Sequence, residues 1–98
     1  MIDPQKYASF QWDKGNLQKS QVKHGITSAV SEEVFLDGNL LISEDIGHSD
    51  KEKRYIAVGR CFDGRVLFVV FTTRVKQIRI ISARIANKKE RRKYEKEA

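Results

Sequence analysis

Apolar residues concentrate in one stretch of the chain, residues 65–86, with the sequence RVLFVVFTTRVKQIRIISARIA. Val66–Thr73 is an almost unbroken run of β-branched and aromatic residues, the pattern of a strand covered on both faces. The second half alternates instead, so Ile78 and Ile80 point to one face of a strand and Arg79 to the other. An arginine inside such a strand needs water or an anion opposite it. The pattern therefore predicts two strands that present basic side chains.

Turn and cap residues divide the rest of the chain into short elements. Gly25 is an expected left-handed helix stop, and Asp63-Gly64 marks a tight hairpin turn. Asn87, with Glu90 three residues later, predicts a capping box that opens a final helix. The expected elements, in chain order, are a strand at 10–12, a helix at about 14–24 capped by Asp13, a helix at about 28–36 capped by Thr27 or Ser28, strands at 40–43, 54–60 and 66–73, a strand after a turn at 74–77, and a helix from Asn87 to about Glu97.

This order of elements predicts an α+β domain with two N-terminal helices, an antiparallel sheet of three to five strands and a C-terminal helix. If the helices cover one face of the sheet, its other face carries the arginines. A chain of 98 residues has room for one domain, 1–98, in which residues 1–9 form a loose lead-in.

Composition argues against several classes of protein. No apolar run approaches the ~20 residues of a membrane span, and the N-terminus lacks the apolar core of a signal peptide, so no membrane association is expected. Cys61 is the single cysteine, which leaves no internal disulfide and favours a cytoplasmic location. One cysteine and two separated histidines form no zinc cluster, and we expect neither a metal nor another cofactor.

Charge is distributed unevenly along the chain. Residues 1–50 contain four lysines against eight Asp and Glu, a net charge of −4. Residues 51–98 contain fifteen Lys and Arg against five Asp and Glu, a net charge of +10. This asymmetry predicts a polyanionic partner for the second half, with a solvated basic surface as the plainer alternative. The basic C-terminal segment lacks the apolar face of a membrane-binding helix.

A basic α+β domain of this kind can bind RNA, DNA or an acidic protein. To cut RNA without a metal, a site needs a base for the 2′-hydroxyl, an acid for the leaving 5′-oxygen and cations for the phosphorane. Guanidinium groups suit the last role because they offer paired donors to phosphate oxygens. The candidate cations are Arg54, Arg79 and Arg84; the candidates for proton transfer are Lys23, His24, Glu52 and Tyr94; and further RNA contacts are expected from Arg74, Lys76, Lys88 and Arg91.

Several of these candidates have a plainer reading. His24, next to a glycine, also fits a helix C-cap, and Glu52 also fits a surface ion pair. Tyr94 is placed to pack its ring on the sheet, and Arg84 to satisfy a loop carbonyl.

Several short motifs follow one another between about residue 10 and residue 95. They are Phe10-Gln11-Trp12-Asp13, Lys23-His24-Gly25-Ile26-Thr27, Val34-Phe35, His48-Ser49, Glu52-Lys53-Arg54-Tyr55, Gly59, IRIISARIA at 78–86 and ERRKY at 90–94. In this order they resemble the BrnT family of bacterial toxins, and the last two are the most specific. Asn16 and Ser20 stand where that family usually has a lysine and an asparagine.

The resemblance implies a RelE-like ribonuclease fold and a toxin of a type II toxin–antitoxin pair, which cleaves RNA and so arrests translation and growth. The implied partner is a BrnA-type antitoxin, a DNA-binding protein that covers the toxin and, with it, represses their shared operon. The resemblance favours a site built from Lys23, His24, Glu52, Arg54, Arg79, Arg84 and Tyr94. Two functions stay open: an active endoribonuclease, and a catalytically inactive module that binds RNA or acts as a co-repressor.

Overall fold

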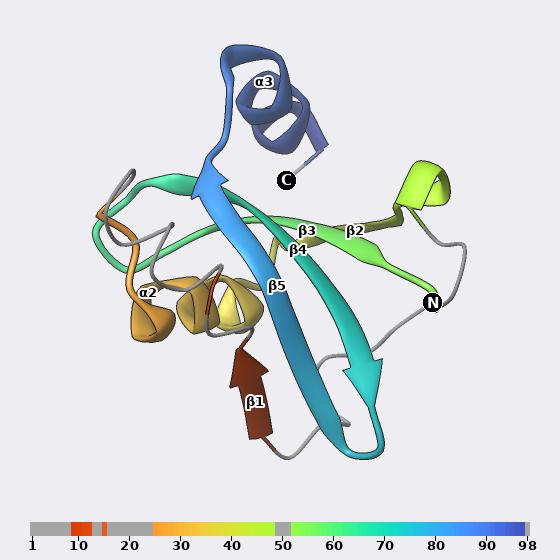
Figure 1. Cartoon of the computed structure of the whole chain (residues 1–98). Coiled ribbons are helices and arrows are strands. Elements are labelled where there is room, and N and C mark those ends of the chain that lie inside the picture. Colours follow the sequence, from red (N-terminus) through yellow and green to blue (C-terminus); the bar gives the residue numbers. More distant parts are fainter. Residues whose placement is uncertain (1–8, 13–14, 16–24, 49–51, 98) are drawn as a thin grey trace.

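The computed structural model describes residues 9–12, 15, 25–48 and 52–97. Five strands form one sheet in the order β1-β5-β4-β3-β2 (Figure 1). The strands are β1 Ser9–Trp12, β2 Leu41–Glu44, β3 Tyr55–Arg60, β4 Val66–Arg74 and β5 Gln77–Ile85. The helices are α2 Ser28–Glu33 and α3 Lys88–Glu97, with the 3-10 turns η2 Val34–Leu36 and η3 Ile46–His48. The predicted α+β class is confirmed.

The sheet is mixed, which corrects the expectation of a wholly antiparallel one. Strands β2 to β5 form an antiparallel meander, but β1 lies parallel to β5, with Phe10 opposite Ile78. Antiparallel neighbours are joined by tight turns, whereas a parallel pair needs a long connection. Here the connection from β1 to β5 runs through α2 and three other strands. This long connection allows β1 and β5 to run in the same direction.

Local chemistry starts two helices where the sequence predicts. The Thr27 hydroxyl accepts a hydrogen bond from the Val30 backbone N–H at 3.2 Å, as an N-cap does. Asn87 and Glu90 each accept the other's backbone N–H at 2.8 Å, so the predicted capping box is confirmed. Gly25 has a left-handed φ of 63°, a conformation that suits glycine. The helix expected at 14–24 lies outside the described residues.

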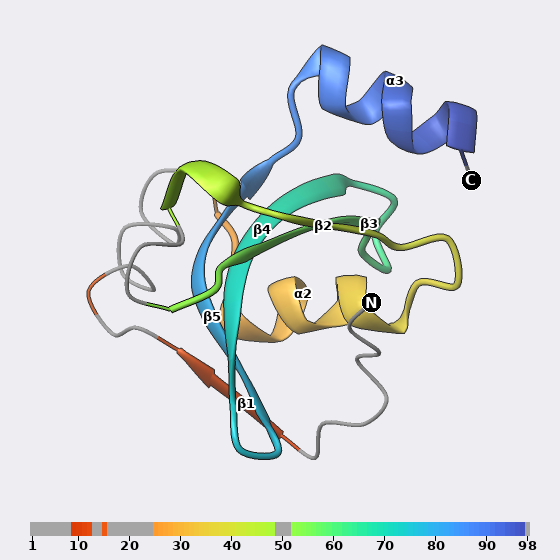
Figure 2. The same cartoon turned by 90° about the vertical axis from the view of Figure 1, so that its right-hand side faces the viewer.

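The two faces of the sheet are covered to different extents. On one face, Leu67, Val69 and Phe71 of β4 are fully buried against the layer formed by α2 and η2. Figure 2 shows α2 and α3 on opposite sides of the sheet. On the α3 side, Phe68 and Val70 stay half-buried, because α3 covers only one end of that face. The expectation that β4 is covered on both faces therefore holds for only part of its length.

Gly59 of β3 allows η2 to approach the sheet closely. A Cβ atom on Gly59 would lie 3.0 Å from Leu40 Cδ1 and 3.1 Å from Val34 Cβ. Contacts this short are rare between real side chains, so only glycine fits here without a shift of η2.

Candidate functional site

Three arginines and one glutamate come together where β4 ends and β5 begins. Arg74 forms an ion pair with the carboxylate of Glu52, and the neighbouring Thr72 hydroxyl donates to the Lys53 carbonyl at 2.8 Å. These contacts hold the segment before β3 against the end of β4. The arginine cluster comprises Glu52, Arg54, Arg74 and Arg79.

Strand register places the other two arginines beside this contact. Arg79 lies directly opposite Thr72 in the β4–β5 ladder. The Arg54 carbonyl accepts from the Asp45 N–H at 2.8 Å, so Arg54 continues strand β3, and Tyr55 pairs with Phe71. Because side chains alternate along a strand, Arg54 and Arg79 belong to the face that also carries α3.

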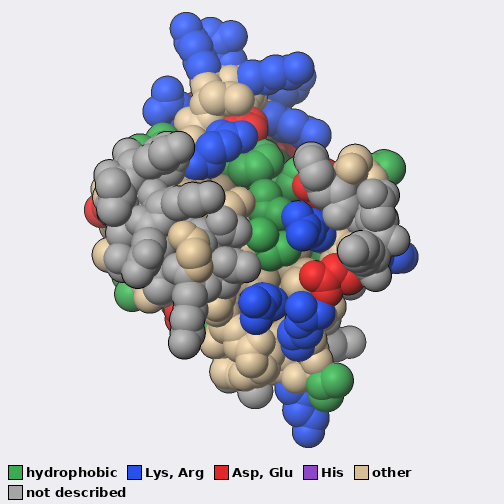
Figure 3. Space-filling model, viewed as in Figure 1, with side chains coloured by type: hydrophobic (Ala, Val, Ile, Leu, Met, Phe, Trp, Pro, Cys, Tyr) green, Lys and Arg blue, Asp and Glu red, His purple; other side chains and the backbone are tan. Residues whose placement is uncertain are grey.

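This face is open to a large ligand. The side chains of Arg74 and Glu52 are 46% and 34% exposed. In Figure 3, Lys and Arg side chains lie around a patch of hydrophobic side chains in the middle of the face, with acidic side chains next to some of them. Such a surface attracts a polyanion and offers apolar contacts at the same time.

Arg84 lies on the same face, nearer to α3. It pairs with Phe68, four residues before Thr72 on β4, or about 13 Å along the strand. Its guanidinium sits over the Phe68 ring at 4.0 Å from the centroid and donates to both Glu90 carboxylate oxygens, at 2.7 and 2.8 Å. The guanidinium lowers the pKa of Glu90, and the carboxylate raises the pKa of Arg84. Any phosphate bound by Arg84 has to compete with this paired carboxylate.

Tyr94 is part of a different contact, at the junction of α3 with the sheet. It is 3% exposed, and its hydroxyl donates to the Asp37 carboxylate, which also accepts the backbone N–H groups of Arg60 and Asn39 at 2.8 and 2.9 Å. Burial and the Asp37 carboxylate raise the pKa of Tyr94. Burial alone would raise the pKa of Asp37 as well, but the hydrogen bonds outweigh it and the pKa is lowered.

The sequence-predicted site residues thus fall into separate places. Tyr94 belongs to the same buried cluster as Val66, a residue that lies about 20 Å along β4 from Thr72 at the arginine cluster. Lys76 lies in the β4–β5 turn, with a left-handed φ of 59°, while Lys88 and Arg91 lie on α3. Lys23 and His24 lie outside the described residues.

Three residues that the sequence did not single out complete these contacts. They are Thr72, which ties down the segment before β3, Phe68, which carries the Arg84 guanidinium, and Asp37, which holds Tyr94. Asp37 belongs to a turn-forming Asp-Gly-Asn sequence, which explains an aspartate at this position without any distant partner. Its hydrogen bond with Tyr94, 57 positions later, could therefore not be predicted from the sequence. Glu90 carried a readable capping signal, but nothing local in the sequence shows that it also pairs with Arg84.

Metal-ligand clusters and membrane-spanning helices were sought in the part of the chain that the structure describes. No group of three or more His, Cys, Asp or Glu side chains among residues 9–12, 15, 25–48 and 52–97 is placed to hold a metal ion. None of the described helices is long and apolar enough to cross a membrane.

The fold and the arginine-bearing face define a small α+β domain suited to a polyanionic ligand. The sequence profile of a family described as "Ribonuclease toxin, BrnT, of type II toxin-antitoxin system" matches residues 12–90. The chain therefore belongs to the BrnT family of ribonuclease toxins, and the resemblance seen in its motifs is confirmed. Membership of a type II toxin–antitoxin family implies an antitoxin as a partner.

Structural comparison agrees with this assignment. The crystal structure of the Brucella abortus ribonuclease toxin BrnT is similar to this chain, with a TM-score of 0.60 over 82% of this chain and 97% of that one. The sequence identity of 22% makes this a likeness of fold. A search of curated proteins found no significant relative.

Proposed function

We propose that this protein is a metal-independent endoribonuclease toxin whose arginine cluster holds the phosphate that is cleaved. The supporting observation is the convergence of Arg54, Arg74 and Arg79 from separate chain segments on the exposed face of the sheet. Fixed guanidinium groups bind phosphate oxygens and stabilise the charge that develops on them during cleavage. Membership of the BrnT family indicates RNA cleavage as the reaction, and we propose the arginine cluster as the site where it takes place.

The chemistry assigned to the cluster needs one base and one acid. The 2′-oxygen attacks the adjacent phosphorus while its proton passes to a base, for which Glu52 is the candidate inside the cluster and His24 the alternative from the sequence. The bond from phosphorus to the 5′-oxygen breaks, and that oxygen receives a proton. The sequence predicts Lys23 or Tyr94 as the donor; we propose Lys23, because the Tyr94 hydroxyl is buried and already donates to Asp37. The products are a 2′,3′-cyclic phosphate end and a 5′-hydroxyl end.

In the cell, we expect RNA cleavage to arrest translation and growth in the cytoplasm until an antitoxin of the BrnA type covers the basic face. Operator DNA would be reached only through that antitoxin. An acidic or apolar segment of the antitoxin suits this face because the face combines arginines with hydrophobic side chains (Figure 3).

A second candidate is a module that binds RNA without cutting it. It is favoured by the observation that Arg74 and Arg84 are both already paired with carboxylates, of Glu52 and Glu90. Such pairs reduce the free positive charge available to a transition state.

Expression of the chain alone in a bacterium, followed by cleavage assays on purified protein with EDTA, separates the two candidates. For an enzyme we expect growth arrest in the cell and RNA cleavage in EDTA. Arg79→Ala or Arg54→Ala should lower the cleavage rate about 10²–10³-fold and relieve the growth arrest. Arg92→Ala, an equal loss of charge at an exposed position of α3, is the control and should keep activity. Harmless expression, with RNA binding that Arg79→Ala weakens, would support the module instead.

A further inference from the structure

Arg84 differs from the other basic residues of the open face because its guanidinium is fixed on several sides. It sits over the Phe68 ring, both terminal nitrogens donate to Glu90, and one of them also donates to the Ile85 carbonyl at 3.2 Å. Glu90 is itself fixed by the Asn87 backbone N–H in the capping box of α3. The planar group therefore has little freedom to turn toward a new partner.

The part of Arg84 that remains accessible suits a flat ligand better than an anion. The side chain is 39% exposed, although three of its five N–H donors are in use. Phe68 lies against the guanidinium and Glu90 takes up one edge, so we expect a ligand to reach it on the side opposite Phe68. A carboxylate or phosphate approaching this face finds few free donors, whereas an aromatic ring can stack on it.

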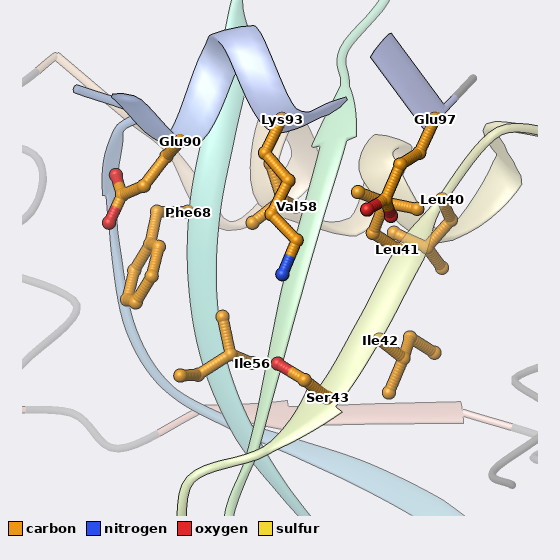
Figure 4. Close-up of a pocket in the computed structure, with 10 residues that line it drawn as sticks. All are labelled: Leu40, Leu41, Ile42, Ser43, Ile56, Val58, Phe68, Glu90, Lys93 and Glu97. Atoms are coloured by element: carbon orange, nitrogen blue, oxygen red, sulfur yellow. The ribbon is translucent and has the colours of Figure 1, made fainter. Parts of the chain in front are cut away.

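An apolar groove begins at this platform and runs beneath α3. It has a volume of about 360 Å³ and shares Phe68 and Glu90 with the platform. Figure 4 shows Ile56, Val58 and Phe68 on the sheet side of the groove, with Glu90 and Lys93 projecting from α3. A nucleoside lying on the platform would therefore also meet apolar surface.

We propose that Arg84, held over Phe68 by Glu90, is a stacking platform for one unpaired base of the RNA. Unstacked bases of single-stranded RNA commonly stack on aromatic rings and on arginine planes. The platform lies about 13 Å along β4 from Thr72, the residue opposite Arg79, so the stacked base belongs to a nucleotide beside the cleaved phosphate. This assignment rests on the proposed function and names its substrate as single-stranded RNA read at a flanking base.

The test uses 2′-O-methyl oligonucleotides, which cannot be cleaved through the 2′-oxygen, with the fluorescent base 2-aminopurine placed at each position in turn. Stacking quenches this base, so we expect strong quenching at one position with the wild-type protein. Arg84→Lys keeps the charge but loses the plane. It should remove that quenching and weaken binding about 5- to 100-fold, while the dependence of affinity on salt stays unchanged.

Two further variants guard against a trivial loss of structure. Glu90→Gln keeps a side chain that serves in a capping box, and Phe68→Leu keeps an apolar contact; each should reduce the quenching in a protein that still melts cooperatively. Quenching that survives Arg84→Lys would overturn the platform, and so would tighter RNA binding by Glu90→Gln, which would show that Arg84 binds phosphate. If the wild type bound no RNA but bound an antitoxin, and Arg84→Lys weakened that antitoxin binding, the surface around Arg84 would be a protein-binding site and the platform would be refuted. Quenching without any cleavage would refute the proposed enzyme and leave the platform standing.

Discussion

Replacing Tyr94 by phenylalanine removes one hydroxyl group and leaves the ring in place. The hydroxyl donates to the Asp37 carboxylate at a buried site, and this hydrogen bond ties α3 to the turn before β2. A hydrogen bond to a charged partner contributes about 1.5–3 kcal/mol to stability. We expect the lower half of this range, about 1.5–2 kcal/mol, because Asp37 keeps its two bonds to backbone N–H groups.

The expected change is readily measured by thermal unfolding. In a domain of this size, each kcal/mol shifts the melting temperature by about 4–8 °C, so Tyr94→Phe should lower it by about 6–16 °C. Asp37→Asn should also destabilise the protein, and the double variant should lose less than the sum of the single losses because both remove one interaction. Tyr55→Phe, which removes the hydroxyl from a ring stacked on Phe71, is the control.

The same variant tests the catalytic role predicted for Tyr94 from the sequence. We expect RNA cleavage by Tyr94→Phe to match the wild type well below the new melting temperature, since Tyr94 belongs to the buried cluster around Val66, at the other end of β4 from the arginine cluster. An unchanged melting temperature, together with a loss of cleavage of 10²-fold or more in folded protein, would refute the structural role and make Tyr94 the proton donor.

Three further predictions concern packing, pH and salt. Gly59→Ala should cost about 1–3 kcal/mol, because its Cβ would press on Val34 and Leu40, whereas Gly38→Ala, with open space around it, should leave the melting temperature unchanged or slightly raised. The pKa of Asp37 is lower in the folded protein than in the unfolded chain, so the carboxylate contributes its full stability above about pH 4 and loses it as the pH falls through the folded-state pKa. Urea unfolding should therefore show a lower free energy of unfolding at pH 3 than at pH 6. In Asp37→Asn this difference between the two pH values should be smaller. If three arginines bind phosphates of single-stranded RNA, affinity should fall roughly 20-fold between about 50 and 200 mM salt, and only about 7-fold in Arg79→Ala; a flat response would point to a protein ligand.

Many elements of the fold could be predicted because they depend on residues close together in sequence. The capping box of Asn87 and Glu90, the hairpin turn at Asp63-Gly64 and the alternation around Arg79 each act over a few positions. The parallel pairing of β1 with β5 could not be read in this way, because it joins Phe10 to Ile78 across most of the chain. Strand pairing at such separation depends on how the whole sheet assembles.

The candidate site shows the same division. The sequence identified Arg54, Arg79 and Arg84 as candidate phosphate ligands, and the structure places all three on one face of the sheet. It also distinguishes them: Arg54 and Arg79 lie with the arginine cluster, whereas Arg84 is held by Phe68 and Glu90. A residue type shows that a guanidinium is present, but only its neighbours show which of its donors are already in use.

Taken alone, the sequence determined the local structure, the basic character of the second half and the family to which the chain belongs, since these follow from propensity, charge and ordered motifs. Tertiary structure decided which cations face each other, which carboxylates pair with them and which side of the sheet stays open. Hydrogen bonds and ion pairs need atoms within about 3–4 Å of each other. Residues as distant in sequence as Asp37 and Tyr94, or Glu52 and Arg74, reach that distance only through the register of the strands and the docking of α3 on the sheet.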